Sequence, residues 1–300
     1  MIALNDENNY EVNNVNVTKC FYNYQVHVQK MIETGALLFA DHISQIFATS
    51  GILLIRNGSV DMELHKFLDI TITRKIKEET YNKIGMYSQK FPRDKFITIM
   101  DIIQELNRGR ITSIKAVSKL LMMVDEDGSE YVNRTILCFK KLIEELPNVQ
   151  YNKEELELIT RVIQPALLPL FDDVENNIYF RWTDAQTEEY KEDGINSSNK
   201  RPDGCVTLMT NKNKNMAFIE VKSAKHSKDK VKLNYDLNKL GVFSKNAIEL
   251  NHLNGVLNIQ IVGADITFYF VEKKAGGLIL LTCQNMAGSP ISATDFFDLV

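Results

Sequence analysis

Two carboxylates and a lysine lie close together in the stretch 201–222. Sixteen residues separate Asp203 from Glu220, Val221 and Lys222. If the residues around Glu220 form a strand, its alternating geometry turns Glu220 and Lys222 to the same face. Burying a carboxylate and an ammonium group in an apolar strand is costly unless they find partners. Asp203, at the end of the preceding strand, is placed to supply one, and the three groups together could form a metal site with an adjacent water-positioning lysine.

The order Pro202-Asp203, then Glu220-Val221-Lys222, resembles the motif of the PD-(D/E)XK nuclease superfamily. The resemblance covers the second half of the chain. It implies a restriction-endonuclease-like core, in which a helix precedes the motif strands and a helix and further strands follow them. The stretch 258–283 also resembles an uncharacterised nuclease-like family that is present in many copies in some fungal genomes.

The resemblance implies a role for each motif residue. Asp203, Glu220 and the backbone carbonyl of Val221 would bind Mg²⁺ or Mn²⁺, which are hard cations that prefer oxygen ligands. Lys222 would orient the attacking water or stabilise the transition state, and a lysine whose pKa is lowered beside the metal could also act as a base. The expected reaction is hydrolysis of a phosphodiester bond in nucleic acid, with DNA as the expected polymer.

Glu155 is a further candidate catalytic residue. It lies at the edge of the apolar stripe of a helix expected from residue 153 to residue 173, so it is the acid there that faces the sheet. In the nuclease family this helix often brings an extra acid to the metal. A glutamate in the first turn of a helix is also favoured by the helix dipole, and both interpretations stay open.

The bulk composition excludes several classes of protein. The net charge of −4 excludes a generally basic coat for nucleic acid, so such a contact would need a local patch. The four cysteines form no CxxC pair and the five histidines are scattered, which argues against a zinc site or a disulfide framework. No membrane span or signal peptide is evident, so an intracellular location, nucleus or cytoplasm, is expected.

A local excess of lysine follows the motif. Residues 220–245 contain seven lysines and three acids. Such an excess could guide a phosphate backbone toward the metal site, or it could decorate a solvated helix face. The lysines predicted to bind nucleic acid are Lys225, Lys228, Lys230, Lys232 and Lys239.

The predicted fold class is α+β, with an N-terminal all-α module followed by an α/β restriction-endonuclease-like core that has a central mixed sheet. Residues 1–18, rich in asparagine, are expected to form a disordered arm. Residues 19–149 show helical periodicity and are expected to form a helical domain. Residues 150–300 are expected to form the nuclease-like domain, with strands at 177–182, 204–210, 216–224, 256–263, 266–274 and 276–283.

Three alternatives compete with the nuclease hypothesis. The Asp-Glu-Lys cluster could be a buried ion-pair network, because such networks also occur in proteins without catalysis. The chain could be a catalytically silent nuclease-fold module that binds nucleic acid. It could also be a scaffold that binds a protein partner through its N-terminal helices, which would then show an exposed apolar patch.

Overall fold

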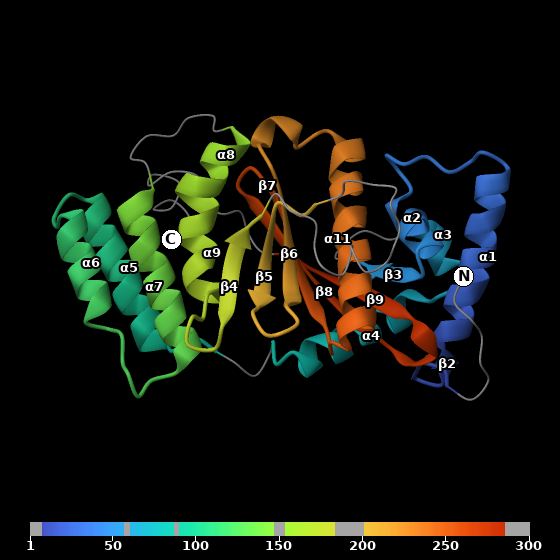
Figure 1. Ribbon diagram of the computed structural model, residues 1–300, viewed down its shortest axis with the longest axis horizontal. Coiled ribbons are helices and arrows are strands. Elements are labelled where there is room, and N and C mark those ends of the chain that lie inside the picture. Colours follow the sequence, from blue (N-terminus) through green and yellow to red (C-terminus); the bar gives the residue numbers. More distant parts are fainter. Residues whose placement is uncertain (1–7, 57–60, 87–89, 147–153, 184–200, 286–300) are drawn as a thin grey trace.

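The computed structural model describes residues 8–56, 61–86, 90–146, 154–183 and 201–285. A seven-stranded mixed sheet, in the order β3-β9-β8-β7-β6-β5-β4, forms its centre (Figure 1). Its strands are β3 (Ile52–Ile55), β4 (Ile178–Trp182), β5 (Gly204–Leu208), β6 (Lys214–Lys222), β7 (Val256–Val262), β8 (Asp265–Lys273) and β9 (Ile279–Asn285). A two-stranded hairpin is formed by β1 (Glu11–Val12) and β2 (Val15–Asn16).

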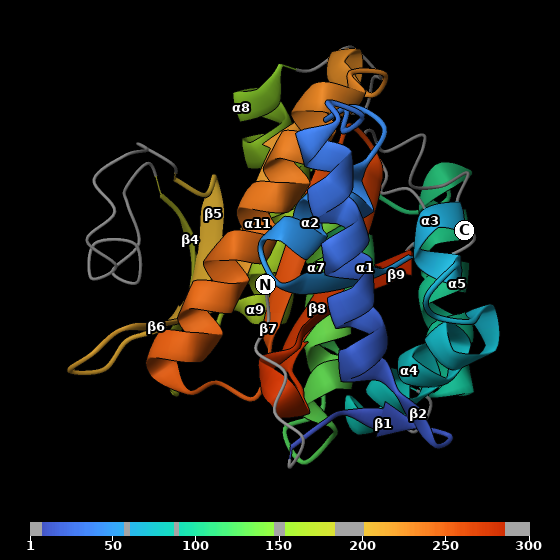
Figure 2. The ribbon, with the colours of Figure 1, turned by 90° about the vertical axis from the view of Figure 1, so that its right-hand side faces the viewer.

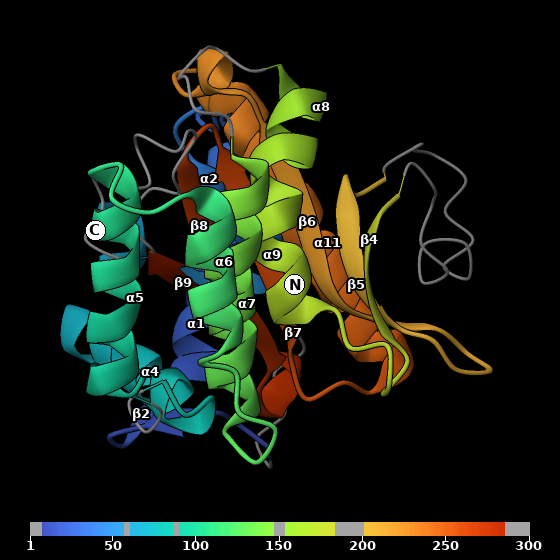
Figure 3. The same cartoon turned by 90° about the vertical axis from the view of Figure 1, so that its left-hand side faces the viewer.

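Helices cover both faces of this sheet. The N-terminal helices are α1 (Val17–Glu33), α2 (Ile43–Thr49), α3 (Met62–His65), α4 (Ile70–Lys83), α5 (Arg93–Asn107), α6 (Ser113–Leu121) and α7 (Glu130–Glu145). The later helices are α8 (Glu155–Leu158), α9 (Gln164–Phe171) and α11 (Lys230–Asn251). Figure 3 shows α6, α7 and α9 on one side of the sheet, and Figure 2 shows α1 and α11 on the opposite side of the molecule.

The expected combination of N-terminal helices and a mixed sheet is confirmed. The helices expected around 92–109, 112–124 and 129–147 are α5, α6 and α7, and Thr112 caps α6 by accepting a hydrogen bond from the backbone of Lys115. The strands expected after residue 176 correspond to β4 to β9. A break expected near Pro165 takes the form of a π-helical turn at Ile159–Ile163, which joins α8 to α9.

One N-terminal segment differs from its predicted structure. Residues 52–55, expected within a helical pattern, form β3 and pair in parallel with β9 at the edge of the main sheet. All four side chains of this strand are buried. A short apolar run that is buried on both faces has no periodicity that distinguishes a strand from a helix. Gly51, just before the run, has φ 76° and was the sequence signal for a break in the helical pattern.

The expected disordered arm is wrong for its described part. Residues 1–7 lie outside the described residues, but 11–16 form the β1–β2 hairpin and α1 begins at Val17. Asn13 and Asn14, at the turn, both have positive φ, a conformation that asparagine tolerates better than most residues. The side chain of Val12 is buried, which anchors the hairpin. The asparagine content that suggested disorder therefore supplies a turn and a helix cap.

The alternation predicted for the motif strand is confirmed. Phe218 packs in the hydrophobic cluster under α11, whereas Ile219 and Val221 pack in the cluster that includes α7 and α9. The strand β6 runs antiparallel to β5 and parallel to β7, and α11 is the crossover between the two parallel strands. Glu220 and Lys222 therefore face α11, and this helix completes their surroundings.

A buried glutamate ties the N-terminal helices to the sheet. Both oxygens of Glu272 on β8 are engaged, by Lys274 at 2.8 Å and by Lys83 of α4 at 2.6 Å, and Thr80 donates a further hydrogen bond at 3.1 Å. Burial alone would raise the pKa of Glu272, but the hydrogen bonds and charges of the two lysines lower it overall. A lowered pKa means that this group stabilises the fold above the pKa of the unfolded chain and loses that contribution in acid.

We expect Glu272→Gln to destabilise the protein by about 1–3 kcal/mol at neutral pH, because two lysines lose their buried anionic partner. The difference between variant and wild type should shrink as pH falls through the folded pKa of Glu272. Urea unfolding between pH 7 and pH 3 measures it. Asp265→Asn, at the exposed start of the same strand, is the matched control and should stay within about 0.5 kcal/mol. Equal effects of the two substitutions would show that the buried contacts of Glu272 contribute nothing.

Candidate functional site

The first acid of the motif is fixed by the pairing of three strands. Asp203 precedes β5, where its backbone N–H donates to the carbonyl of Ile219 at 3.1 Å. Its carboxylate accepts a hydrogen bond from the backbone of Val221 at 2.7 Å. The next residue, Gly204, lets β4 pack closely against β5, because a Cβ there would lie 2.9 Å from the Trp182 ring of β4. Asp203 is thus held beside the end of β6, as the strand order predicts.

The second acid is almost completely buried. Glu220 is 1% exposed, and its Oε1 lies 2.6 Å from Nζ of Lys239 on α11. The other oxygen, Oε2, is buried without a hydrogen-bond partner among the described residues. Burial, reinforced by the charge of Asp203, raises the pKa of Glu220 to about 9 despite Lys239. The positive charge of Lys239 alone therefore does not compensate the cost of ionising Glu220.

The lysine of the motif lies among carboxylates. Its Nζ is 3.9 Å from Asp203, 3.5 Å from Glu155 and 3.4 Å from Asp236. It also donates to the carbonyl oxygen of Val221 at 2.8 Å. Burial alone would lower the pKa of Lys222, but the surrounding carboxylates raise it overall. Lys222 is therefore a protonated donor, not a neutral base, in this arrangement.

Asp236 of α11 is a site residue that the sequence analysis missed. It is 4% exposed, and burial raises the pKa of its carboxyl group although Lys222 and Lys239 oppose the shift. Asp236 and Lys239 are three residues apart, so they share the face of α11 that also buries Leu240 and Phe243. The sequence signal for this role was the presence of two charged residues, Asp236 and Lys239, within the apolar stripe of a helix.

Glu155 comes to the same place from the opposite layer of the fold. It is the first residue of α8, which lies beside the turn that leads from β6 to α11, at the top of Figure 1. Its neighbour Glu154 is exposed and pairs instead with Lys225. The helical geometry thus identified the correct acid of the pair, while a catalytic role for Glu155 stays a prediction. We call Asp203, Glu220, Asp236 and Glu155, with Lys222 and Lys239, the acidic site.

The acidic site offers oxygen ligands, but these ligands are not arranged as a complete coordination shell for a metal ion. Among the described residues, no group of three or more His, Cys, Asp or Glu side chains is arranged to hold a metal ion. The predicted set needs fewer: two carboxylates, Asp203 and Glu220, and the Val221 carbonyl. The unpartnered Oε2 of Glu220 and the all-oxygen donor set fit Mg²⁺ or Mn²⁺. In this arrangement Lys222 contacts the Val221 carbonyl, so metal binding there requires the ammonium group to move aside.

The predicted nucleic-acid lysines fall into two groups. Four of them, Lys225, Lys228, Lys230 and Lys232, are exposed on the segment from the end of β6 into α11. Lys239 differs from these four, because its side chain is only 11% exposed and is paired with Glu220. A phosphate contact needs an exposed head group, so Lys239 belongs to the acidic site. Its position three residues after Asp236 could have indicated this.

Comparison with family models, with curated proteins and with solved structures finds no match to this chain. The resemblance to PD-(D/E)XK nucleases therefore stays a prediction that rests on the motif residues. No helix in the described part of the chain is long and apolar enough to cross a membrane. The expected location and the protein partner of the N-terminal helices stay predictions as well.

We expect Asp236→Asn to weaken divalent-cation binding about 10- to 100-fold, as loss of a group that supports the ligands of a metal typically does. The substitution keeps the shape of the side chain, so the fold should survive. Calorimetric titration with Mn²⁺ measures the change. Glu249→Gln, an exposed position on the same helix, is the control and should leave the affinity unchanged. An unchanged affinity of the Asp236 variant would remove Asp236 from the site.

Proposed function

We propose that this protein is a metal-dependent nuclease that hydrolyses phosphodiester bonds in nucleic acid, with DNA as the expected polymer. One observation carries the proposal: four carboxylates surround two lysines at the acidic site, an excess of two negative charges when all are ionised. Glu220 and Asp236 in this set are almost completely buried, and an excess of two negative charges is what one divalent cation neutralises. The motif that resembles the PD-(D/E)XK superfamily, and the strand–strand–helix order that carries it, support the same assignment.

The chain's own residues suit this chemistry. Asp203, Glu220 and the Val221 carbonyl would hold Mg²⁺ or Mn²⁺. A bound cation would lower the pKa of a coordinated water and offset charge on the scissile phosphate. Lys222 stays protonated, because acids surround it, so it can orient the attacking water and donate to a phosphate oxygen as the P–O bond to the leaving group breaks.

The remaining acids and lysines have supporting tasks. Lys239 keeps Glu220 oriented, and Asp236 and Glu155 keep Lys222 between the two layers of the fold. Outside the acidic site, Lys225, Lys228, Lys230 and Lys232 are exposed and would attract a phosphate backbone. Electrostatic attraction there would steer the substrate in a chain that is acidic overall.

Cleavage assays test the proposal directly. Purified protein with Mg²⁺ or Mn²⁺ is incubated with plasmid, single-stranded DNA and RNA, beside Glu220→Ala and a chelator control. We expect one polymer to be cleaved by the wild type only when metal is present, and by the variant not at all. Equal cleavage by wild type and variant would assign the activity to a contaminant, and the proposal would fail.

A second candidate is a catalytically silent module that binds nucleic acid. The contact of Lys222 with the Val221 carbonyl favours it, because the lysine partly satisfies the site without a metal. Such a module would bind DNA or RNA with a steep salt dependence and turn over none of it. Replacing Lys228 and Lys232 by glutamine should then reduce the slope of log affinity against log salt by about 2 for duplex DNA.

A further inference from the structure

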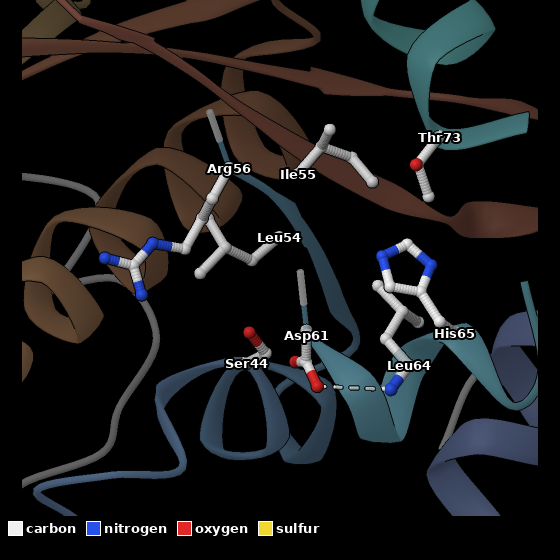
Figure 4. Close-up of a pocket in the computed structure, with 8 residues that line it drawn as sticks. All are labelled: Ser44, Leu54, Ile55, Arg56, Asp61, Leu64, His65 and Thr73. Carbon is white, nitrogen blue, oxygen red and sulfur yellow. Dashed lines mark hydrogen bonds between the residues drawn. The ribbon is translucent and has the colours of Figure 1, made fainter. Parts of the chain in front are cut away.

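Two cavities lie beside the end of β3, and Arg56 lines both. The smaller one, of about 40 Å³, lies among residues that include Asp61, His65 and Thr73. It has room for little more than water. Figure 4 shows that the guanidinium group of Arg56 points away from His65 and Thr73, while Asp61 is engaged in capping Leu64. The small cavity therefore leaves Arg56 available to the second one.

The second cavity has about 450 Å³ of space, within the size range of small-molecule sites. Its floor is formed by β7 and β8, through residues such as Gln260 and Thr267, and its roof by the first turns of α11. The segment before α2 and Arg56 close the side. We call it the α11 cavity. It lies on the same face of the sheet as Glu220, because Gln260 is the register partner of Glu220 in the β6–β7 ladder.

The walls of the α11 cavity are held by hydrogen bonds. Asn234 of α11 donates to the carbonyls of Phe39 and Ala40 at 2.9 and 3.0 Å, which fixes the segment before α2. Gln260 donates to the carbonyl of Leu233 at 2.8 Å, and the hydroxyl of Tyr269 donates to Gln260 at 3.3 Å. Floor and roof are thus tied together around the cavity, and a ligand would meet a preformed site.

The lining combines three kinds of surface. Leu233 and Leu237 supply an apolar wall against which a flat ring can lie. Arg56 and Lys230 supply cations, and Asp41 and Asp265 supply carboxylates. The ammonium group of Lys230 lies 3.4 Å from the carboxylate of Asp41. Both side chains of this pair are more than half exposed, so the ammonium group can turn to a ligand at little cost.

We propose that the α11 cavity binds a nucleoside 5′-monophosphate. The phosphate would pair with Arg56 and Lys230, because guanidinium groups bind phosphate with two parallel hydrogen bonds. The base would lie against Leu233 and Leu237, and the Asp265 carboxylate can accept hydrogen bonds from ribose hydroxyls. This site is separate from the acidic site and does not depend on nuclease activity. A bound nucleotide would contact α11, which also carries Asp236, and β7, which pairs with β6.

Binding is measured by calorimetry on the full chain with a chelator present, so that no metal site contributes. The probes are AMP, GMP, CMP and UMP, the four matching nucleosides, and inorganic phosphate. We expect at least one monophosphate to bind with a stoichiometry of one. It should bind at least about 10-fold more tightly than its nucleoside, which lacks the charge-assisted contacts, and than phosphate, which lacks the base.

Two substitutions in the cavity, with two controls, test where the ligand binds. Arg56→Gln should weaken monophosphate binding about 10-fold or more while leaving nucleoside binding unchanged. Thr267→Phe fills the cavity from its floor and should abolish both, with thermal unfolding as the check on the fold. Arg74→Gln, an exposed arginine on α4, should change neither. Glu220→Ala should bind as the wild type does, which separates this site from the proposed nuclease.

The proposal is overturned if no monophosphate binds, if phosphate alone binds as tightly as the monophosphate, or if binding survives both Arg56→Gln and Thr267→Phe in folded protein. A ligand lost with Glu220→Ala but retained in the two cavity variants would belong to the acidic site and would equally overturn it.

Discussion

Replacing Lys222 by methionine should reduce the rate of metal-dependent cleavage about 100- to 1,000-fold, the usual cost of removing one preorganised donor to the transition state. Methionine keeps the length and the apolar stem of the side chain but removes the ammonium group. The effect should fall on the rate at saturating substrate, because Lys222 acts on charge that develops during the reaction.

Single-turnover measurements on the polymer that the wild type cleaves would quantify the loss. Lys225→Met is the matched control, since Lys225 is exposed and pairs with Glu154 outside the acidic site. It should lower the rate by less than about 10-fold, through weaker substrate steering alone. Thermal unfolding of both variants establishes that the fold is intact. A Lys222 variant with more than a tenth of wild-type activity would contradict the assigned role.

Replacing Glu220 by glutamine should stabilise the metal-free protein at pH 8, although the same change should abolish catalysis. The pKa of Glu220 is raised to about 9 in the folded chain, mainly by burial. A raised carboxyl pKa means that the folded state binds more protons than the unfolded state. The stability that depends on Glu220 is then fully present below the unfolded pKa, about 4.3, and is lost as pH rises toward 9.

Glutamine removes this titration, so the gain should be on the order of a few kcal/mol at pH 8 and should vanish near pH 4. Asp236 lies near Lys239 and limits the cost of leaving that lysine without Glu220. Chemical denaturation across the pH range, with a chelator present, measures the difference. A variant less stable than the wild type at pH 8 would show that the Glu220–Lys239 pair stabilises the fold by itself, and the need for a cation would disappear.

The sequence predicted the site better where its residues lie on one strand than where the fold brings distant segments together. The alternation along β6 placed Glu220 and Lys222 on one face, and the paired strands β5 and β6 placed Asp203 beside them. Asp236 was missed because α11 buries polar as well as apolar residues, and only the packing of its face on β6 decides which polar residues enter the site.

Two further differences have the same physical origin. Lys239 was predicted to bind nucleic acid, but its side chain is only 11% exposed and pairs with Glu220 of β6. Residues 52–55 were expected in a helix, but they form a strand that pairs with β9. This partner lies more than two hundred residues later in the chain. Local patterns carry no information about a partner at that separation.

The most direct test of the central claim is a calorimetric titration of the chelator-treated protein with Mn²⁺ at pH 8, beside Asp203→Asn and Glu220→Gln. Unlike a cleavage assay, it does not depend on a correct guess of the polymer. We expect the wild type to bind the cation, to gain thermal stability from it, and to release protons as Glu220 ionises. Both variants should lose these effects. A folded wild-type protein that binds no divalent cation would contradict the account and leave the acidic site as an ion-pair network.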